Sequence, residues 1–235
     1  MPVPTGSTNF EEAPEKARVG TTPLEMRQPL GPSFQVANGE VTWQNWHFRF
    51  RLDPRVGPVI NLAGFEDNGH VRSVLYQGSL SELFVPYMDP AEGWATRVFL
   101  DAGEFFPMGV LSALREGIDC PADASYFDAL YSDEQGIPVL QSKRACLYKI
   151  APGQPTWRHF EKNEVWGRPS RLLVLRTTLV IGNYDYLIDW RFGRDGSIQV
   201  AVGATGIIEV KPVKEKAPAK LLQARRRTQR GDGQG

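Results

Sequence analysis

The sequence LVIGNYDYLIDW, at residues 179–190, has the alternation of side chains that is typical of a β-strand. One face of that strand would carry Tyr184, Tyr186, Ile188, Trp190 and, just beyond, Phe192. The other face would carry Asp185, Leu187, Asp189 and Arg191. A period of two indicates a sheet with one face turned to the core. Gly182 inside the stretch predicts a bulge, or a place where another group approaches the backbone closely.

The residues next to Tyr184 disagree with the strand that contains them. Asn183 and Asp185 flank the tyrosine, and both residue types are disfavoured in strands. A local conflict inside an otherwise strong strand is typical of a functional site. We therefore expect chemistry near Tyr184.

Short strand patterns recur along the chain, separated by turn sequences. The patterns lie at residues 41–52, 56–65, 71–77, 146–150, 156–160, 171–181 and 197–204. The turn sequences DNG at 67–69 and GRDG at 193–196 predict hairpins. Between residues 104 and 163, glycine and proline are expected to break the chain into short segments. Many short strands with frequent turns predict an all-β protein, a β-sandwich with little helix.

Length and composition indicate one globular domain with polar ends. The chain has 235 residues, 41% of them hydrophobic and 11% aromatic, and its formal net charge is zero. Neutral charge gives no reason to expect a nucleic-acid partner, and no apolar run is long enough to span a membrane. Residues 1–18 lack the apolar core of a signal peptide, so the cytoplasm is the default location. Residues 1–29 are predicted to form an arm, and residues 209–235 a disordered basic tail.

Several segments, taken in order, resemble the copper-containing amine oxidases. They are QPLGPSF at 28–34, RSVLYQGSLSELFVPYMDP at 72–90, DAGE at 101–104 and NYDY at 183–186. The resemblance runs from about Arg27 to Ile207 and implies that residues 30–208 are part of the family's catalytic β-sandwich. It also implies that residues 1–29 are a linker from a preceding domain. Later strands of the sandwich would be absent, which would leave sheet edges open.

The resemblance implies that Tyr184 is a cofactor precursor, although its residue type alone would suggest an ordinary buried tyrosine. In the family this tyrosine is oxidised near Cu(II) to topaquinone, which forms a Schiff base with a primary amine. Asn183 would orient the quinone, and Ile181 and Gly182 would lie beside the substrate. With O2, the family converts the amine to an aldehyde, ammonia and hydrogen peroxide, and works as a homodimer.

Three further residues receive roles from the resemblance. Asp101 would accept a proton from the bound substrate, a task suited to a carboxylate whose pKa burial has raised. Otherwise it is a turn carboxylate. Tyr87 would hydrogen-bond a quinone oxygen; the alternative is a loop tyrosine packed by proline. Phe99 would gate the substrate channel; the alternative is a core phenylalanine.

The histidines do not match the family's copper ligands. Those ligands are a His-x-His pair and a third histidine, all beyond the tyrosine. The three histidines of this chain, His47, His70 and His159, all precede Tyr184, and none are two residues apart. No metal ligand is assigned, so the chain by itself is expected to be inactive.

The cysteines and the overall function leave alternatives open. Without the resemblance, Cys120 and Cys146 would be two free thiols; with it, they are expected to form a disulfide. A second hypothesis for function is a non-catalytic β-sandwich that binds or regulates a full-length relative. A third is an unrelated β-sandwich binding module. The sequence does not indicate which amine is preferred.

Overall fold

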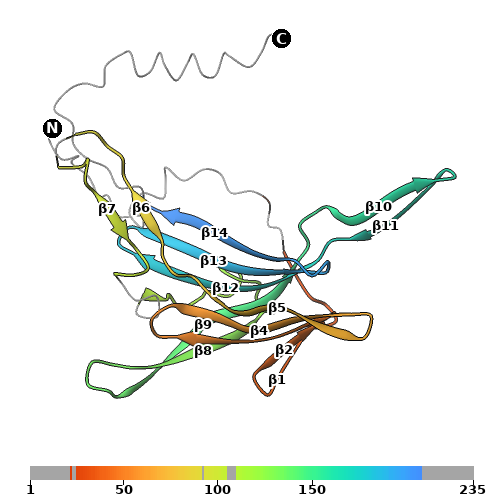
Figure 1. Cartoon of the computed structure of the whole chain (residues 1–235), viewed down its shortest axis with the longest axis horizontal. Coiled ribbons are helices and arrows are strands. Elements are labelled where there is room, and N and C mark those ends of the chain that lie inside the picture. The colour runs from red at the N-terminus through yellow and green to blue at the C-terminus, as the bar shows by residue number, and fades with distance from the viewer. Residues whose placement is uncertain (1–21, 23–24, 92, 105–109, 208–235) are drawn as a thin grey trace, which may run out of the picture. The chain divides into compact units, whose positions relative to one another are not determined.

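Two five-stranded antiparallel sheets form the body of the protein in the computed structural model (Figure 1). The structure describes residues 22, 25–91, 93–104 and 110–207, so the predictions for most of the N-terminal arm and for the tail lie outside it. All the strands belong to one compact unit, Leu24–Ile207. In the described part of the chain, no helix has the length and apolar character that crossing a bilayer requires.

The first sheet contains five strands in sequence order, joined as a meander. They are β1 (Gln35–Ala37), β2 (Glu40–Trp43), β3 (Trp46–Asp53), β4 (Gly57–Asp67) and β5 (His70–Ser79). Residues 41–52 therefore form two strands, and the prediction of one continuous strand was wrong. The predicted turn between β4 and β5 is confirmed. Asn68 and Gly69 have φ of +51° and +78°, the pair of positive angles that a type I′ hairpin requires.

The second sheet has the order β14-β13-β12-β9-β8. Its strands are β8 (Ser125–Ser132), β9 (Pro138–Ile150), β12 (Leu172–Ile181), β13 (Tyr184–Gly193) and β14 (Ile198–Gly206). β8 and β9 occupy a region where only short segments were expected, and β9 has 13 residues. That prediction was wrong because β9 pairs with β8 along residues 138–147 and with β12 along residues 146–150, so the strand extends through the weak strand formers at 141–144.

Residues 179–190 contain the end of β12, a two-residue turn and most of β13. β12 and β13 pair in unbroken register from Leu172↔Gly193 to Ile181↔Tyr184, with Gly182 and Asn183 as the two-residue loop. Gly182 has φ of +59° and Asn183 has no positive φ, which is the pattern of a type II′ turn. The predicted bulge at Gly182 is therefore wrong. A Cβ on Gly182 would meet no atom within 4 Å, so the predicted close approach is wrong as well.

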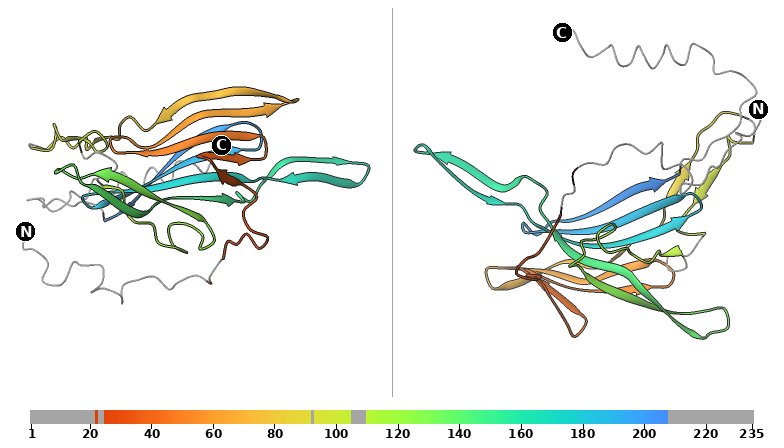
Figure 2. Two further views of the ribbon diagram at one scale, coloured as in Figure 1. Left: turned by 90° about the horizontal axis from the view of Figure 1, so that it is seen from below. Right: turned by 180° about the vertical axis from the view of Figure 1, so that it is seen from behind.

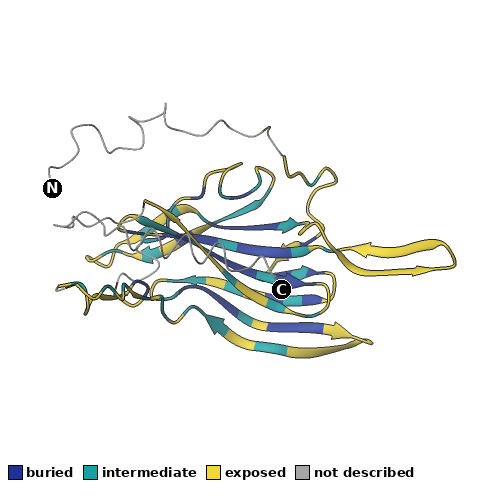
Figure 3. Cartoon of the chain, turned by 90° about the horizontal axis from the view of Figure 1, so that it is seen from above, coloured by how far each residue is buried: buried dark blue, intermediate teal, exposed yellow. Residues whose placement is uncertain are grey.

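The core lies between the two sheets, as the burial pattern in Figure 3 shows. The Phe48 ring of β3 stacks on the Phe192 ring of β13 with their centroids 4.1 Å apart. Trp46 is fully buried and donates a hydrogen bond to the Gly193 carbonyl across the sandwich, at 2.7 Å. The apolar face predicted for residues 184–192 thus packs inward, and the predicted sandwich is confirmed.

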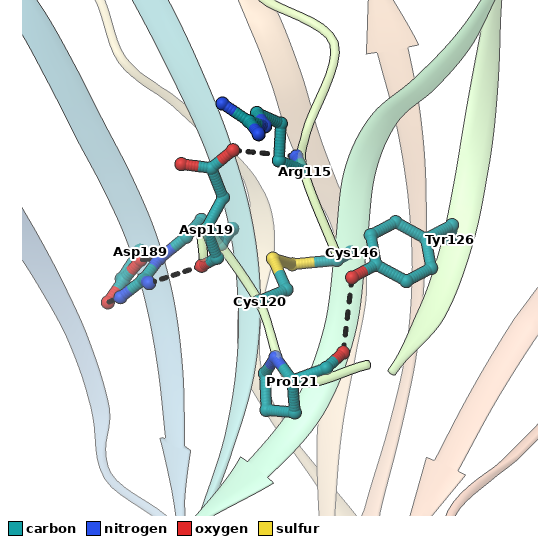
Figure 4. The surroundings of a disulfide bond; sticks show 8 residues. Arg115, Asp119, Cys120, Pro121, Tyr126, Cys146 and Asp189 are labelled. Atoms are coloured by element: carbon teal, nitrogen blue, oxygen red, sulfur yellow. Dashed lines mark hydrogen bonds and ion pairs between the residues drawn. A yellow bond between two sulfur atoms is a disulfide. The ribbon is translucent and has the colours of Figure 1, made fainter. Parts of the chain in front are cut away.

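The outer face of the second sheet carries a disulfide and an ion cluster (Figure 4). Cys120 and Cys146 form the disulfide that the resemblance implied, and it fastens the segment before β8 to β9. Beside it, Arg176 forms a salt bridge with the buried Asp189 at 2.6 Å and donates to the Asp119 carbonyl. Arg191 completes the cluster on the other side of Asp189, at 2.9 Å.

Two shorter strand pairs extend from the sandwich. β10 (Pro155–Glu161) and β11 (Glu164–Pro169) form an arm in which every residue is exposed, and which projects from the sheets in each view (Figure 2). β6 (Phe84–Pro86) and β7 (Val98–Leu100) form the second pair. This second pair carries the residues considered next.

Candidate active site

The β6–β7 pair brings two distant segments to the first residues of β13. Tyr87 directly follows β6, Phe99 lies in β7, and Asp101 directly follows β7. On β13, Tyr184 and Tyr186 are two residues apart and therefore lie on the same face of the strand. That face is the inner one, because Tyr186 packs in the same apolar cluster as Leu179 and Ile188. Four residues that were predicted to be functional therefore lie together at one end of the sandwich, namely Tyr87, Phe99, Asp101 and Tyr184.

Tyr184 is half-buried and its hydroxyl faces that of Tyr87. The two oxygens are 3.3 Å apart, within hydrogen-bonding distance. The Tyr87 ring is held edge-on by two aromatic rings of the same hairpin, Phe99 at 5.6 Å and Trp94 at 5.7 Å between centroids. Edge-to-face packing of this kind favours a fixed ring orientation. Phe99 therefore contacts Tyr184 indirectly, through the ring of Tyr87.

Asp101 is held by the next inward tyrosine of the same strand. The Tyr186 hydroxyl donates to Asp101 Oδ2 at 2.7 Å, and the two residues are only 7% and 5% exposed. The Tyr184 and Tyr186 ring centroids are 6.4 Å apart. Burial first, and then the hydrogen bond to Asp101, raise the pKa of Tyr186 well above its usual value. The Tyr186 hydroxyl therefore keeps its proton and donates it in the hydrogen bond to Asp101.

The turn before Tyr184 is shaped by a contact that sequence patterns did not indicate. Ile181 is buried, whereas Gly182 and Asn183 are exposed. The close approach lies at Gly206 of β14, where an added Cβ would be 2.3 Å from the Asn183 carbonyl oxygen. Gly206 also has φ of +105°, which an L-residue rarely adopts. The Asn183 carbonyl then accepts from the Ile207 amide at 2.8 Å. These contacts fix the backbone on which Tyr184 sits.

Two cavities lie away from these residues. One of about 520 Å³ is lined by Lys149, Arg171 and Arg194 among others, and one of about 640 Å³ by Arg191 and Arg194. Both lie near the end of β13 opposite Tyr184 and belong to exposed loops. We attach no function to them.

The side chains in the described part of the chain do not form a site that fits a copper ion. Imidazole nitrogen suits copper, but three histidines would have to converge. His47 pairs with Gly64 across β3 and β4, His70 begins β5, and His159 lies on the exposed β10. Within residues 25–91, 93–104 and 110–207, no group of three or more His, Cys, Asp or Glu could hold a metal. His47 instead lies between Glu40 and Glu66, at 4.0 and 3.8 Å.

Comparison with known proteins decides the family. The enzyme domain of copper amine oxidase matches residues 35–225. The chain belongs to the copper amine oxidase family. It is 45% identical over 197 residues to copper-containing amine oxidase gamma 2 of Arabidopsis thaliana. The aligned region covers 80% of this chain and 29% of that enzyme.

Other members of the family agree. The primary amine oxidase of Klebsiella aerogenes is 35% identical over 221 residues, covering 92% of this chain and 28% of that enzyme. The copper-containing benzylamine oxidase from Hansenula polymorpha superimposes with a TM-score of 0.74 at 31% identity, over 82% of this chain and 30% of that one. This chain therefore spans less than a third of the length of these relatives.

Within the family's fold, sequence reasoning missed three residues of the site. Tyr186 was assigned only to the core face, although it is the donor to Asp101. Glu82, whose carboxylate accepts from the Ala102 amide directly after Asp101 at 3.0 Å, was not singled out, and neither was Gly206. A glycine at the end of a strand is a weak signal, and the contact of Glu82 is with residues about 20 positions away, so no local pattern marks it.

Proposed function

We propose that this chain carries the tyrosine and the proton acceptor of a primary amine oxidase. The reaction would convert a primary amine, O2 and water to an aldehyde, ammonia and hydrogen peroxide. Topaquinone made from Tyr184 would supply the carbonyl to which the amine adds and the capacity to take up two electrons. Copper would be held by ligands that the three histidines of this sequence do not supply. The functional unit would be a homodimer.

The observation that carries the proposal is the joint placement of Asp101 and Tyr184. The Tyr186 hydroxyl engages Oδ2 of Asp101, so Oδ1 is the oxygen that would accept a proton. The Tyr87 hydroxyl, 3.3 Å from that of Tyr184, would restrain the oxidised ring. Asn183 would restrain it from the turn. A base positioned in this way lowers the cost of proton transfer because its orientation is fixed before the substrate binds.

The substrate would enter past Phe99, whose ring packs against Tyr87. Ile181 and Gly182 would border the amine on the other side. Apolar groups at these positions exclude water around Asp101, which is itself 5% exposed. Exclusion of water strengthens electrostatic interactions within the site.

The test supplies the missing metal ligands in trans. The chain is expressed in air with Cu(II), either alone or together with the part of the Arabidopsis relative that follows its match to this chain. In the paired sample, we expect a redox-cycling quinone stain, and a mass gain of two oxygens less two hydrogens on the peptide containing Tyr184. Tyr184→Phe should abolish both signals, and Asp101→Asn should keep the stain but lose amine-dependent peroxide. A pair that retains copper but leaves Tyr184 unmodified would refute the proposal.

A second candidate function is a non-catalytic subunit that binds or regulates a full-length relative. It is favoured by the lack of a metal cluster in the described residues and by β14, the last strand of its sheet. Val200 and Val202 on that strand are 46% and 48% exposed. Co-purification with a relative, together with a change in that relative's rate and no quinone on Tyr184, would support this function.

A further inference from the structure

Glu82 makes an unusual set of hydrogen bonds beside the candidate active site. It lies two residues before the start of β6, and its carboxylate points toward the end of β7. One oxygen, Oε1, accepts from the amides of Leu83 at 2.9 Å, Ala102 at 3.0 Å and Gly103 at 2.9 Å. The Asp101 amide meanwhile donates to the Leu83 carbonyl at 2.9 Å. Two consecutive residues, 82 and 83, therefore satisfy three consecutive amides that begin at Asp101.

These bonds extend the β6–β7 ladder beyond its last backbone pair, Phe84↔Leu100. A strand cannot continue there, because residues 101–104 turn, and the Glu104 amide donates back to the Leu100 carbonyl at 2.9 Å. Successive amides that converge in a turn form a concavity suited to an anion. The Glu82 carboxylate occupies this concavity. In keeping with this, the amide of Gly103 first, and those of Leu83 and Ala102 after it, lower the pKa of Glu82.

The residue at position 103 must be small for this arrangement to exist. A Cβ on Gly103 would lie 2.3 Å from Glu82 Oε2 and 3.3 Å from its carboxyl carbon. Gly103 does not have a positive φ, so its backbone conformation is open to alanine. The requirement for glycine is therefore one of space, and the space is taken by Glu82.

We propose that Glu82 is a positioning residue that holds the turn carrying Asp101 against Tyr186. The inference rests on the proposed function, since the position of this turn matters for catalysis only if Asp101 accepts the proton. Glu82 acts through the backbone of the turn and touches no reacting atom. Removing its carboxylate frees two amides directly after Asp101. Among the described residues, the backbone of the turn then keeps its bonds to the Leu83 and Leu100 carbonyls, and the Asp101 side chain keeps its bond from Tyr186.

The test uses the full chain without copper or amine, so it does not depend on quinone formation. In Glu82→Ala, hydrogen exchange at the Ala102 and Gly103 amides should become at least about tenfold faster, the effect expected for loss of a hydrogen bond to a charged group. The 13C-labelled ring of Tyr186 should change its chemical shift, because its acceptor has moved. Glu82→Gln keeps an oxygen acceptor and should restore both signals to near the original values.

Two further variants separate positioning from general loss of stability. Glu104→Ala removes a carboxylate from the same turn and should leave all these signals unchanged. Gly103→Ala should reproduce the effects of Glu82→Ala, because its Cβ would clash with the Glu82 carboxylate. In the double variant Glu82→Ala with Gly103→Ala, the second substitution should add little, because that carboxylate is gone. An unchanged Tyr186 signal in Glu82→Ala would overturn the proposal, as would equal acceleration of exchange in the core strand β12. Failure of the proposed function would instead show as absence of quinone on Tyr184, with these results unaffected.

Discussion

Gly206→Ala should disturb the turn that carries Tyr184, and the size of the effect follows from two features of the backbone. The first is φ of +105° at Gly206, which alanine would adopt only with strain of about 1–3 kcal/mol. The second is contact. The new Cβ would lie 2.3 Å from the Asn183 oxygen and 3.0 Å from the Tyr184 Cα, and both of these are backbone atoms that cannot rotate away. Together we expect a loss of about 2–4 kcal/mol in the free energy of unfolding.

Gly203→Ala provides a matched control on the same strand. Gly203 has no positive φ, and its new Cβ would lie 3.6 Å from the Leu187 Cβ, an ordinary packing distance. Alanine there should stabilise the strand by about 0.5–1 kcal/mol, since glycine loses more conformational entropy on folding. The two substitutions are chemically identical and three residues apart, so their difference isolates the close approach.

Urea unfolding measures the stability of both variants, and 13C-labelled tyrosine reports on the site. We expect a lower urea midpoint and a shifted Tyr184 ring signal for Gly206→Ala only. The Tyr184 signal should shift because its Cα must move away from β14 and with it the hydroxyl that faces Tyr87. If Gly206→Ala unfolds at the same urea concentration as Gly203→Ala, the argument that β14 shapes this turn is wrong.

Three further outcomes can be measured by unfolding experiments. Reduction of the disulfide, which closes a loop with a sequence separation of 26, should lower the free energy of unfolding by about 3.5 kcal/mol. Urea unfolding curves recorded with and without dithiothreitol measure this difference. Burial raises the pKa of Tyr148 to about 12, so between about pH 10 and 12 only the unfolded state loses this proton, and stability should fall by about 1.4 kcal/mol per pH unit. Tyr148→Phe should remove that part of the slope, and an unchanged slope would contradict the assignment. Asp189→Asn leaves two arginines beside a buried site and should cost about 3–5 kcal/mol, whereas Glu116→Gln in an exposed pair should cost less than about 1 kcal/mol; similar losses would refute the distinction.

The sandwich could be predicted from the sequence because its strands alternate strongly. The inward face of β13 was identified from period two alone, and the Asn68-Gly69 turn from its residue types. Two of the errors, at residues 41–52 and at Gly182, arose where one pattern covers two strands. At Gly182-Asn183 the inward face changes from the odd-numbered residues of β12 to the even-numbered residues of β13. A two-residue hairpin produces the same one-residue shift as a bulge in a continuous strand.

The site could be predicted only in part, and the reason is the range of the contacts. Tyr87, Asp101 and Tyr184 were named from segments that resemble a family, and the structure brings them to one end of the sandwich. What holds them was not predictable in this way. The Glu82 carboxylate accepts from backbone amides about 20 residues away, and Gly206 lies against the backbone of Asn183 and Tyr184, so no residue type specifies either contact in advance.

The two halves of the proposed chemistry therefore have different structural origins in this chain. In the proposed reaction, proton transfer would depend on a carboxylate, a tyrosine hydroxyl and a ring that are placed before the substrate binds, and β13 and the turn after β7 hold these groups. Their supports, Glu82 and Gly206, act through backbone amides and a backbone carbonyl, neither of which involves a histidine. The geometry around Asp101 is thus set by the fold itself, whereas the proposed oxidation of Tyr184 would need a metal centre that His47, His70 and His159 do not form. Because the two requirements are separable, variants of Glu82 test the first without the second.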